Sequence, residues 1–346
     1  MTLNEIKAQD PDGMYEAIRT FPDQFSVGRT AAASPALPES EFASVVICGM
    51  GGSAIGGELL CSLVAPASST PFFVNRSYDL PAFVDDRALV IISSYSGNTE
   101  ETLSAFDEAE KRGATIIGLT SGGKVQERCE NAGYPVVVMP GGMQPRAALG
   151  YSFAALVTIA ERLAFIKSQE EAWEEAIALL HDLAEQEANP DRSSGYELAE
   201  SLWDLTPLIY TGNGLLRPVG TRWCGQIQEN AKRLAFGNRL PELNHNEIMG
   251  WEERSAIHRQ IGIVMLHDSG DHAAVRRRAE VTKELLHDRA AKWIDVHSQG
   301  RSPLARMLSI IHLGDWFSFY LAMLHGVDPT PVKLISRLKE TLATTV

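Results

Sequence analysis

The sequence predicts an α/β protein made of two similar units, each with a parallel sheet covered by helices on both faces. Short apolar runs rich in β-branched residues, such as 88–92, alternate with longer stretches of helical spacing, such as 99–112. Strands and helices alternating at these lengths favour a covered parallel sheet. This alternation of strands and helices then starts again in the second half of the chain. The run 207–210 leads into the glycine-bearing turn 211–214, as the earlier strand 44–48 leads into the glycine loop 49–57.

The chain divides into four segments in this interpretation: a short helical lead-in and linker at 1–40, a first unit at 41–168, a charged helical connector at 169–195 and a second unit at 196–346. In the first unit we expect strands at 44–48, 71–74, 88–92, 115–119 and 135–139, and helices at 99–112 and 147–166. The connector helix is expected at 169–187, with its charged residues forming a solvated face. In the second unit we expect strands at 207–210, 261–266 and 292–296, and helices at 219–234, 273–286 and 303–324, followed by one short C-terminal helix.

Composition excludes several classes of partner. With 346 residues the chain has room for two ordinary domains. The 31 basic against 44 acidic residues give a net charge of −13, which argues against nucleic acid or an anionic membrane as a partner. The four cysteines are scattered without metal-like spacing. No apolar segment is expected to span a membrane and the N-terminus does not read as a signal peptide, so we expect a cytoplasmic protein.

The stretch from Ser94 to Thr102 joins the buried strand 88–92 to a helix. Such a turn directs unpaired backbone N–H groups and the positive end of a helix dipole toward one point. Short hydroxyl donors are added by Ser94, Ser96, Thr99 and Thr102. An ordinary N-cap at Asn98 or Thr99 needs one hydroxyl rather than four. We therefore favour a phosphate-binding loop.

A glycine loop at 49–57 follows the first strand and is expected beside the serine loop, because both follow carboxyl ends of strands. It partly matches a dinucleotide fingerprint, but 75–77 lacks the acidic residue that this motif requires. Ser53, placed where the helix begins, suits a contact to phosphate better. The alternative is that the glycines serve only close packing of strand and helix.

Three further residues are candidates for the functional site because of their positions in the predicted elements. Arg146 stands at the head of a helix, against the dipole, so we expect a bound anion or a developing negative charge to compensate it; the alternative is an exposed surface arginine. Glu229 lies off the apolar stripe formed by Ile227 and Leu234, although a surface pair with Lys232 would also explain it. His245 lies in the irregular stretch 241–251, which is typical of a site loop, and with Glu247 alone it makes a poor metal ligand set.

As a set, these segments resemble the bifunctional phosphoglucose/phosphomannose isomerases, two-domain members of the sugar isomerase (SIS) superfamily. The resemblance lies in Gly49-Met50-Gly51-Gly52-Ser53, Ser94-Tyr95-Ser96-Gly97-Asn98-Thr99, Gln144-Pro145-Arg146, Gln226-Ile227-Gln228-Glu229-Asn230, Leu243-Asn244-His245-Asn246-Glu247, and Asp328-Pro329-Thr330-Pro331 to Leu338-Lys339. It extends from about residue 41 to the end, and leaves the first forty residues without a part in it. It implies two SIS-type three-layer αβα domains, with an N-terminal lead-in and a C-terminal helix.

The resemblance also implies a role for each matching residue. The sugar 6-phosphate would be held by Gly52, Ser53, Ser94, Ser96 and Thr99. Glu229 would be the base that moves a proton through a cis-enediol, and Arg146 would stabilise the enediolate. Ring opening would be assisted by Lys339 and by His245, the latter from the second subunit of a homodimer. Thr330 would influence acceptance of the mannose epimer, and neither a metal nor a redox cofactor is implied.

We therefore expect an isomerase that interconverts glucose 6-phosphate, and also mannose 6-phosphate, with fructose 6-phosphate. One alternative is a non-catalytic sugar-phosphate sensor of the same superfamily, although the acidic chain shows no DNA-binding appendage. The other is a nucleotide-dependent dehydrogenase, which rests on the glycine loop alone.

Overall fold

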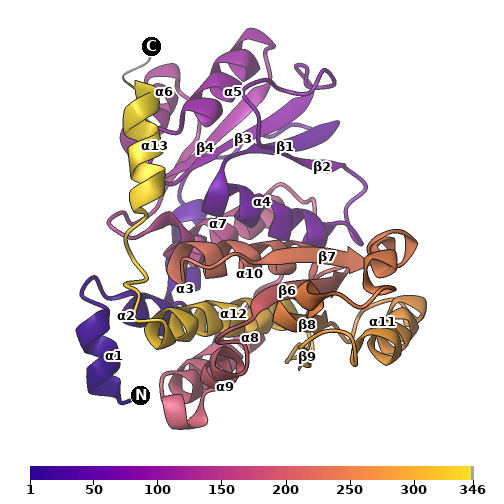
Figure 1. Ribbon diagram of the computed structural model, residues 1–346. Coiled ribbons are helices and arrows are strands. Elements are labelled where there is room, and N and C mark those ends of the chain that lie inside the picture. The colour runs from indigo at the N-terminus through magenta and orange to yellow at the C-terminus, as the bar shows by residue number, and fades with distance from the viewer. Residues whose placement is uncertain (344–346) are drawn as a thin grey trace.

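Two separate parallel sheets form the framework of the protein, whose computed structural model describes residues 1–343 (Figure 1). The first sheet has the strand order β2-β1-β3-β4-β5 and the second β7-β6-β8-β9. The strands are β1 (Ser44–Cys48), β2 (Phe72–Asn75), β3 (Ala88–Ser94), β4 (Thr115–Thr120), β5 (Val136–Val138), β6 (Thr206–Gly212), β7 (Phe236–Leu240), β8 (Ile261–His267) and β9 (Lys292–His297). Every pairing is parallel, so the expected fold class is confirmed.

Helices cover both faces of the first sheet because its central strands alternate apolar side chains between two cores. The strand β1 directs Val45 and Ile47 into one core and Val46 into the other. The helices of this unit are α4 (Gly51–Val64), α5 (Glu100–Lys111), α6 (Gly123–Ala132) and α7 (Leu149–Arg162). α4 and α7 bury their apolar residues in the first core, and α5 and α6 in the second.

The first of these cores continues without a break into the second unit. The helices that follow are α8 (Glu170–Glu187), α9 (Ser194–Ser201), α10 (Arg217–Asn230), α11 (Ala273–Leu286), α12 (Pro303–Leu324) and α13 (Lys333–Ala343). Figure 1 shows α4, α7 and α10 between the two sheets, and α4 contacts α10, so the contact between the units is made by helices. The connector helix α8 buries Trp173, Ala176 and Leu180 against this core and is more than a solvated linker.

The first forty residues contain the expected helical lead-in, but they are also packed into the core. They form α1 (Leu3–Gln9), α2 (Met14–Arg19) and α3 (Asp23–Ala33), and α3 packs against α7. Phe21 and Phe25 are fully buried. The Gln24 side chain donates to the carbonyl of Ala147 (2.8 Å) and accepts from the N–H of Gly150 (3.0 Å). This segment therefore braces the start of α7, directly after Arg146.

The second unit differs from the expectation in the end of one helix and in one additional strand. α10 ends at Asn230, and Leu234, expected in the core, is 69% exposed. β7 was not expected, because its sequence Phe-Gly-Asn-Arg-Leu lacks the β-branched run that marks the other strands.

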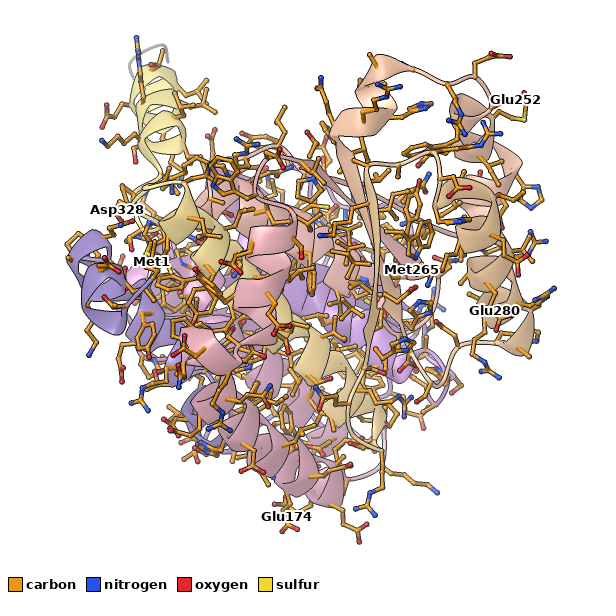
Figure 2. The ribbon with its side chains drawn as sticks, turned by 60° about the horizontal axis from the view of Figure 1, so that its bottom comes forward. Met1, Glu174, Glu252, Met265, Glu280 and Asp328 are labelled. Atoms are coloured by element: carbon orange, nitrogen blue, oxygen red, sulfur yellow. The ribbon has the colours of Figure 1, made fainter. Side chains whose placement is uncertain are left out.

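Two helices near the C-terminus have contrasting environments. α12 is long and apolar enough to cross a membrane, contrary to our expectation for the sequence, but 89% of its most apolar window is buried inside the protein. It is therefore the central core helix of the second unit. α13 instead projects from the body in both Figure 1 and Figure 2, and exposes Leu334, Leu338 and Leu342, which share one face of the helix.

Candidate active site

The glycine loop and the serine loop meet at the carboxyl edge of the first sheet, as expected. β1 and β3 are neighbours, and the backbone N–H of Tyr95 donates to the Ser53 hydroxyl (3.2 Å). A Cβ atom at Gly49 would lie only 2.7 Å from the carbonyl oxygen of Ser93, so a glycine is required where the loops touch. This is the point at which the strand order reverses, where open α/β sheets bind ligands.

The serine loop forms a cradle of hydroxyl and amide groups before α5. The Ser94 and Thr99 hydroxyls are 2.9 Å apart, and Ser94 also accepts from the N–H of Gly97 (3.1 Å). Thr99 is the N-cap of α5, yet its side chain makes no capping hydrogen bond. Ser96 is exposed beside it. The N-terminal N–H groups of α5 thus remain available, which is the arrangement that binds phosphate at a helix terminus.

Arg146 reaches this cradle through the backbone of its own loop. It lies in a short 3₁₀ helix at Pro145–Ala147. A Cβ atom at Gly52, in the first turn of α4, would lie 2.9 Å from the carbonyl oxygen of Pro145. Gly52 therefore permits the Arg146 loop to approach the helix that carries Ser53.

Arg146 is only 3% exposed, so the alternative of a surface arginine is wrong. Its Nε donates to the Asn230 Oδ1 (2.7 Å), and its Nη2 donates to the carbonyls of Pro329 (2.8 Å) and Thr330 (2.9 Å). The remaining Nη1 faces the Glu229 carboxylate at 3.3 Å. Burial lowers the pKa of Arg146, and the neighbouring Glu229 opposes that shift.

Glu229 lies one residue before the end of α10, with 35% of its side chain exposed. Its carboxylate faces Arg146, whereas the Lys232 ammonium bonds to backbone carbonyls, so the alternative of a surface pair between Glu229 and Lys232 is wrong. The site thus presents an accessible carboxylate beside a buried, fully engaged cation. Such a pair can remove a proton and stabilise the anion that results.

A buried polar network behind Arg146 was not found from the sequence. The Arg222 guanidinium donates to the carbonyl of Arg146 (3.0 Å) and to Asp315 (2.7 Å). The Asn230 amide donates to the Ser318 hydroxyl (3.0 Å). Burial raises the pKa of Asp315, and Arg222 counteracts this. The available signal was Asp315 itself, a charged residue inside the apolar helix α12, because buried charges in proteins are paired.

Two residues predicted for the site, His245 and Lys339, do not lie beside Glu229 of the same chain. Glu229 precedes β7 and His245 follows it, so the two lie beyond opposite ends of a strand about 16 Å long. His245 is exposed. Lys339 lies on the projecting helix α13, and across residues 1–343 the structure shows no hydrogen bond or ion pair from it to Arg146 or Glu229.

Thr330 does lie at the site. Its carbonyl accepts from Arg146, its N–H donates to the Asp328 carboxylate (3.0 Å), and its buried hydroxyl has no hydrogen-bond partner within the described residues. The turn before α13 is therefore part of the site, while the helix itself points away from the body.

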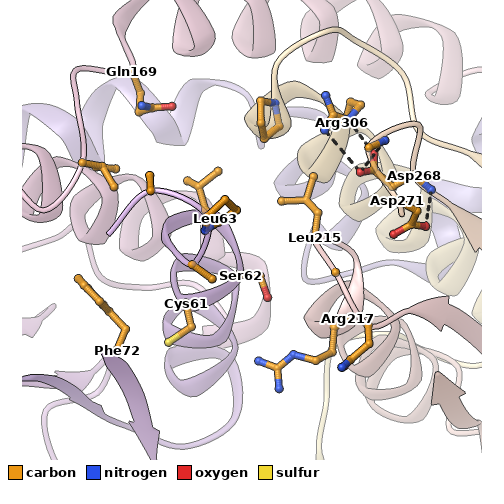
Figure 3. Close-up of a pocket in the computed structure, with 18 of the residues that line it drawn as sticks. Cys61, Ser62, Leu63, Phe72, Gln169, Leu215, Arg217, Asp268, Asp271 and Arg306 are labelled. Atoms are coloured by element: carbon orange, nitrogen blue, oxygen red, sulfur yellow. Dashed lines mark hydrogen bonds and ion pairs between the residues drawn. The ribbon is translucent and has the colours of Figure 1, made fainter. Parts of the chain in front are cut away.

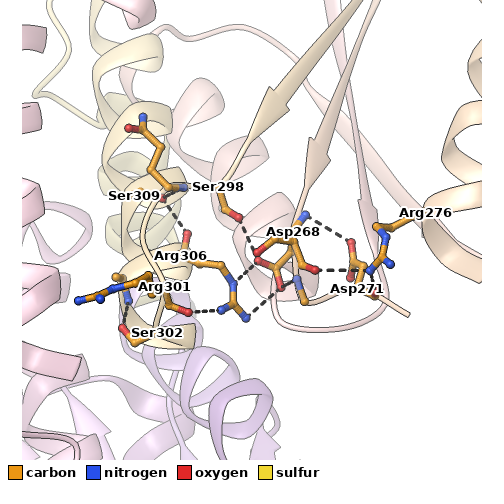
Figure 4. Close-up of polar contacts among 12 residues, drawn as sticks. Asp268, Asp271, Arg276, Ser298, Arg301, Ser302, Arg306 and Ser309 are labelled. Atoms are coloured by element: carbon orange, nitrogen blue, oxygen red, sulfur yellow. Dashed lines mark hydrogen bonds and ion pairs between the residues drawn. The ribbon is translucent and has the colours of Figure 1, made fainter. Parts of the chain in front are cut away.

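The second sheet has a crevice at the corresponding carboxyl edge, but its chemistry differs. A cavity of about 1480 Å³ lies between the units and is lined by Arg217, Asp268, Asp271 and Arg306 among others (Figure 3). Asp268 accepts from Arg306 (2.7 Å) and from the Ser298 hydroxyl (3.0 Å), as Figure 4 shows. Asp271 fills the space beside Gly212, where a Cβ atom would lie 2.6 Å from its carboxylate. Carboxylates here occupy the place that hydroxyls occupy in the first unit, so the carboxyl edge of the first sheet is the one suited to phosphate.

Comparison with known proteins shows the family of the chain. A family model described as the bacterial phospho-glucose isomerase C-terminal SIS domain matches residues 191–342. A bifunctional phosphoglucose/phosphomannose isomerase from Caldicellulosiruptor bescii is 44% identical over 95% of this chain and 99% of its own length. The chain belongs to the bifunctional phosphoglucose/phosphomannose isomerase family.

Similarity to this isomerase family extends into the first forty residues, because it covers 95% of the chain. The expectation that this segment carries no part of the resemblance is therefore wrong. A D-glucosamine-6-phosphate 4-epimerase from Sulfolobus acidocaldarius is 34% identical over 65% of this chain and 69% of its own. The crystal structure of a hypothetical protein from Thermus thermophilus shares the fold, with a TM-score of 0.77, 16% identity and coverage of 99% of this chain and 93% of that one.

Proposed function

We propose that the protein interconverts glucose 6-phosphate, and also mannose 6-phosphate, with fructose 6-phosphate. The observation that carries the proposal is the Glu229 carboxylate 3.3 Å from buried Arg146, whose loop touches the hydroxyl cradle through Gly52. We place this reaction in cytoplasmic carbohydrate metabolism, at the step shared by glycolysis and gluconeogenesis. Residues 41–168 and 196–346 would be the two SIS domains.

The proposed reaction is a proton transfer between neighbouring carbons of the opened sugar. Glu229 takes the proton from C2 of the aldose, the electron pair forms the C1–C2 double bond, and the C1 carbonyl oxygen becomes an enediolate oxygen. Arg146 stabilises that negative charge, and it needs no reorganisation because four groups already hold it. A proton then passes from the C2 hydroxyl to the C1 oxygen, and return of the first proton to C1 leaves the carbonyl at C2, which gives the ketose. The phosphate contacts orient the reacting carbons from a distance.

The same enediolate accounts for two epimeric aldoses. Its carbons are planar, so a proton can return to C2 from either face if the pocket accepts both orientations of the sugar. The Thr330 hydroxyl, which has no hydrogen-bond partner in the part of the chain that the structure describes, lies beside the carbonyls that hold Arg146, and this supports a role in accepting the mannose epimer.

Phosphate recognition by the serine loop is tested by the double variant Ser96→Ala, Thr99→Ala. We expect the KM for glucose 6-phosphate to rise about tenfold to a hundredfold, since two donors to a charged group are lost, while kcat changes less. Steady-state kinetics measure both constants. Ser62→Ala, on the far end of α4, serves as a control. An unchanged KM in the double variant would remove the phosphate assignment.

We also propose a homodimer in which His245 completes the site of the partner subunit. Two observations support it: His245 and Glu229 lie beyond opposite ends of β7, and α13, which carries Lys339, exposes an apolar face that another subunit can cover. Lys339 would then assist ring opening at a site completed by the dimer.

Subunit mixing tests this arrangement. Glu229→Gln and His245→Ala subunits are each expected to be nearly inactive as homodimers. In a mixed dimer one site receives both wild-type residues, so an equimolar mixture should recover about a quarter of wild-type activity, from half of the dimers with one good site each. Exchange is followed with differently tagged subunits. No recovery after confirmed exchange would contradict the shared site.

The proposal as a whole is tested by a coupled assay with glucose 6-phosphate and mannose 6-phosphate, each with and without a chelator. We expect turnover of both sugars and no effect of the chelator. Loss of activity that zinc restores would contradict the metal-independent mechanism, and absence of turnover with both sugars would overturn the isomerase assignment. Glucosamine 6-phosphate is included because a relative is named as an epimerase of that sugar phosphate.

A further inference from the structure

Lys232 occupies a backbone conformation that lysine rarely adopts. It lies directly after the end of α10, three residues beyond Glu229, with a φ of 55°. This left-handed region favours glycine, and a bulky residue held there requires surrounding contacts that compensate the strain. Those contacts lead to the active site.

The Lys232 ammonium bridges two segments that build the site. Its Nζ donates to the carbonyl of Glu229, at the C-terminal end of α10, and to the carbonyl of Pro329 (3.0 Å). The Pro329 carbonyl also accepts from Arg146 (2.8 Å). One side chain therefore connects the helix end that carries Glu229 to the turn that holds Arg146.

We propose that Lys232 is a positioning residue for the isomerisation, which clamps the Glu229 end of α10 to the 328–331 turn and so sets the base against Arg146. The inference rests on the proposed function and adds a residue to it. The clamp joins two elements almost a hundred residues apart in sequence. It adds a direct link to the one that Arg146 makes between Asn230 and the same turn. A misplacement of about 1 Å between reacting groups can cost about a hundredfold in rate.

The electrostatic setting makes the clamp sensitive to pH. Partial burial and then the neighbouring Arg146 lower the pKa of Lys232 to about 8, while Asp328 and Glu229 oppose the shift. Below this pH the ammonium offers three donors and a positive charge to the two carbonyls. As the pH rises through about 8 the charge is lost, and both contacts weaken. Activity that depends on the clamp should therefore decline on the alkaline side.

Lys232→Met and Lys232→Arg test the proposal, with Lys292→Met on the exposed end of β9 as the matched control. We expect Lys232→Met to lower kcat by about tenfold to a hundredfold with a much smaller change in KM. Lys232→Arg should restore most of kcat and move the alkaline limb of the kcat profile upward, because arginine stays charged. Thermal denaturation of each variant establishes that it is folded.

Amide hydrogen exchange provides a readout that does not depend on substrate. In Lys232→Met the amides of 326–332 should exchange faster than in the wild type, with no change in β3. Wild-type kcat, an unmoved alkaline limb in Lys232→Arg and unchanged exchange would overturn the inference while leaving the isomerase assignment intact. If the wild type does not turn over hexose phosphates, the proposed function fails, and the exchange result alone decides whether the clamp exists.

Discussion

Glu229→Gln is expected to lower kcat for glucose 6-phosphate by about 10²–10⁴-fold, the usual contribution of a positioned base. The amide keeps the shape of the carboxylate but cannot accept the proton from C2. Binding of the sugar phosphate should change little, because the phosphate contacts lie on the loops of the first unit. Assays quenched after long incubation measure the residual kcat. Fluorescence or calorimetric titration measures the affinity for fructose 6-phosphate.

The control for this substitution is Glu174→Gln, on the exposed side of α8 and, in Figure 2, far from Asp328, which begins the turn that belongs to the site. It removes the same charge without touching Arg146. A Glu229→Gln enzyme that keeps more than about a tenth of wild-type kcat would exclude Glu229 as the base, given the range above. That result would move attention to another acid–base group and would leave the phosphate cradle unaffected.

The sheets could be predicted from the sequence because their signal is local. β3 begins with five apolar residues and is buried along its whole length, and β8 is a largely apolar run whose five interior residues are buried, so their composition alone marks them as covered strands. β7 was not predicted because it is an edge strand whose side chains are mostly exposed, and only its pairing with β6 identifies it as a strand.

The N-terminal helices could not be predicted as part of the core because their partners lie far along the chain. The buried aromatic residues Tyr15, Phe21 and Phe25 are interspersed with polar residues, and α2 and α3 are too short to be stable alone. They fold against α7, α8 and α12, from which they gain an aromatic cluster around Trp173 and Trp316. The same distance in sequence concealed the hydrogen bonds from Gln24 to the start of α7.

Within the site, the sequence indicated which residues take part but not the contacts that surround them. The resemblance pointed to Arg146 and Glu229, and the fold brings them together from opposite units. Nothing local to either residue reveals that Asn230 orients the guanidinium or that Lys232 bonds to carbonyls instead of to the Glu229 carboxylate. These contacts depend on where the 328–331 turn passes, which is a tertiary property.

The second large effect is expected for Arg146, where charge and shape can be separated. Arg146→Lys keeps the charge but loses the planar fork that reaches Asn230 and two carbonyls at once. We expect kcat to fall by about 10²–10³-fold, as for loss of a preorganised oxyanion donor, and Arg146→Met should fall further. Arg277→Lys, an exposed arginine paired only with Glu280 among the described residues, is the control.

Stability should distinguish an electrostatic role of Arg146 from a purely structural one. Arg146→Met leaves buried acceptors at Asn230, Pro329 and Thr330 without their donor, so the free energy of unfolding should fall by about 3 kcal/mol. Arg146→Lys should recover part of this stability, measured by urea denaturation, yet recover little of kcat, because one ammonium cannot hold the 328–331 turn and face the enediolate together. If lysine restores kcat in proportion to stability, Arg146 acts only by holding the fold, and enediolate stabilisation must come from elsewhere.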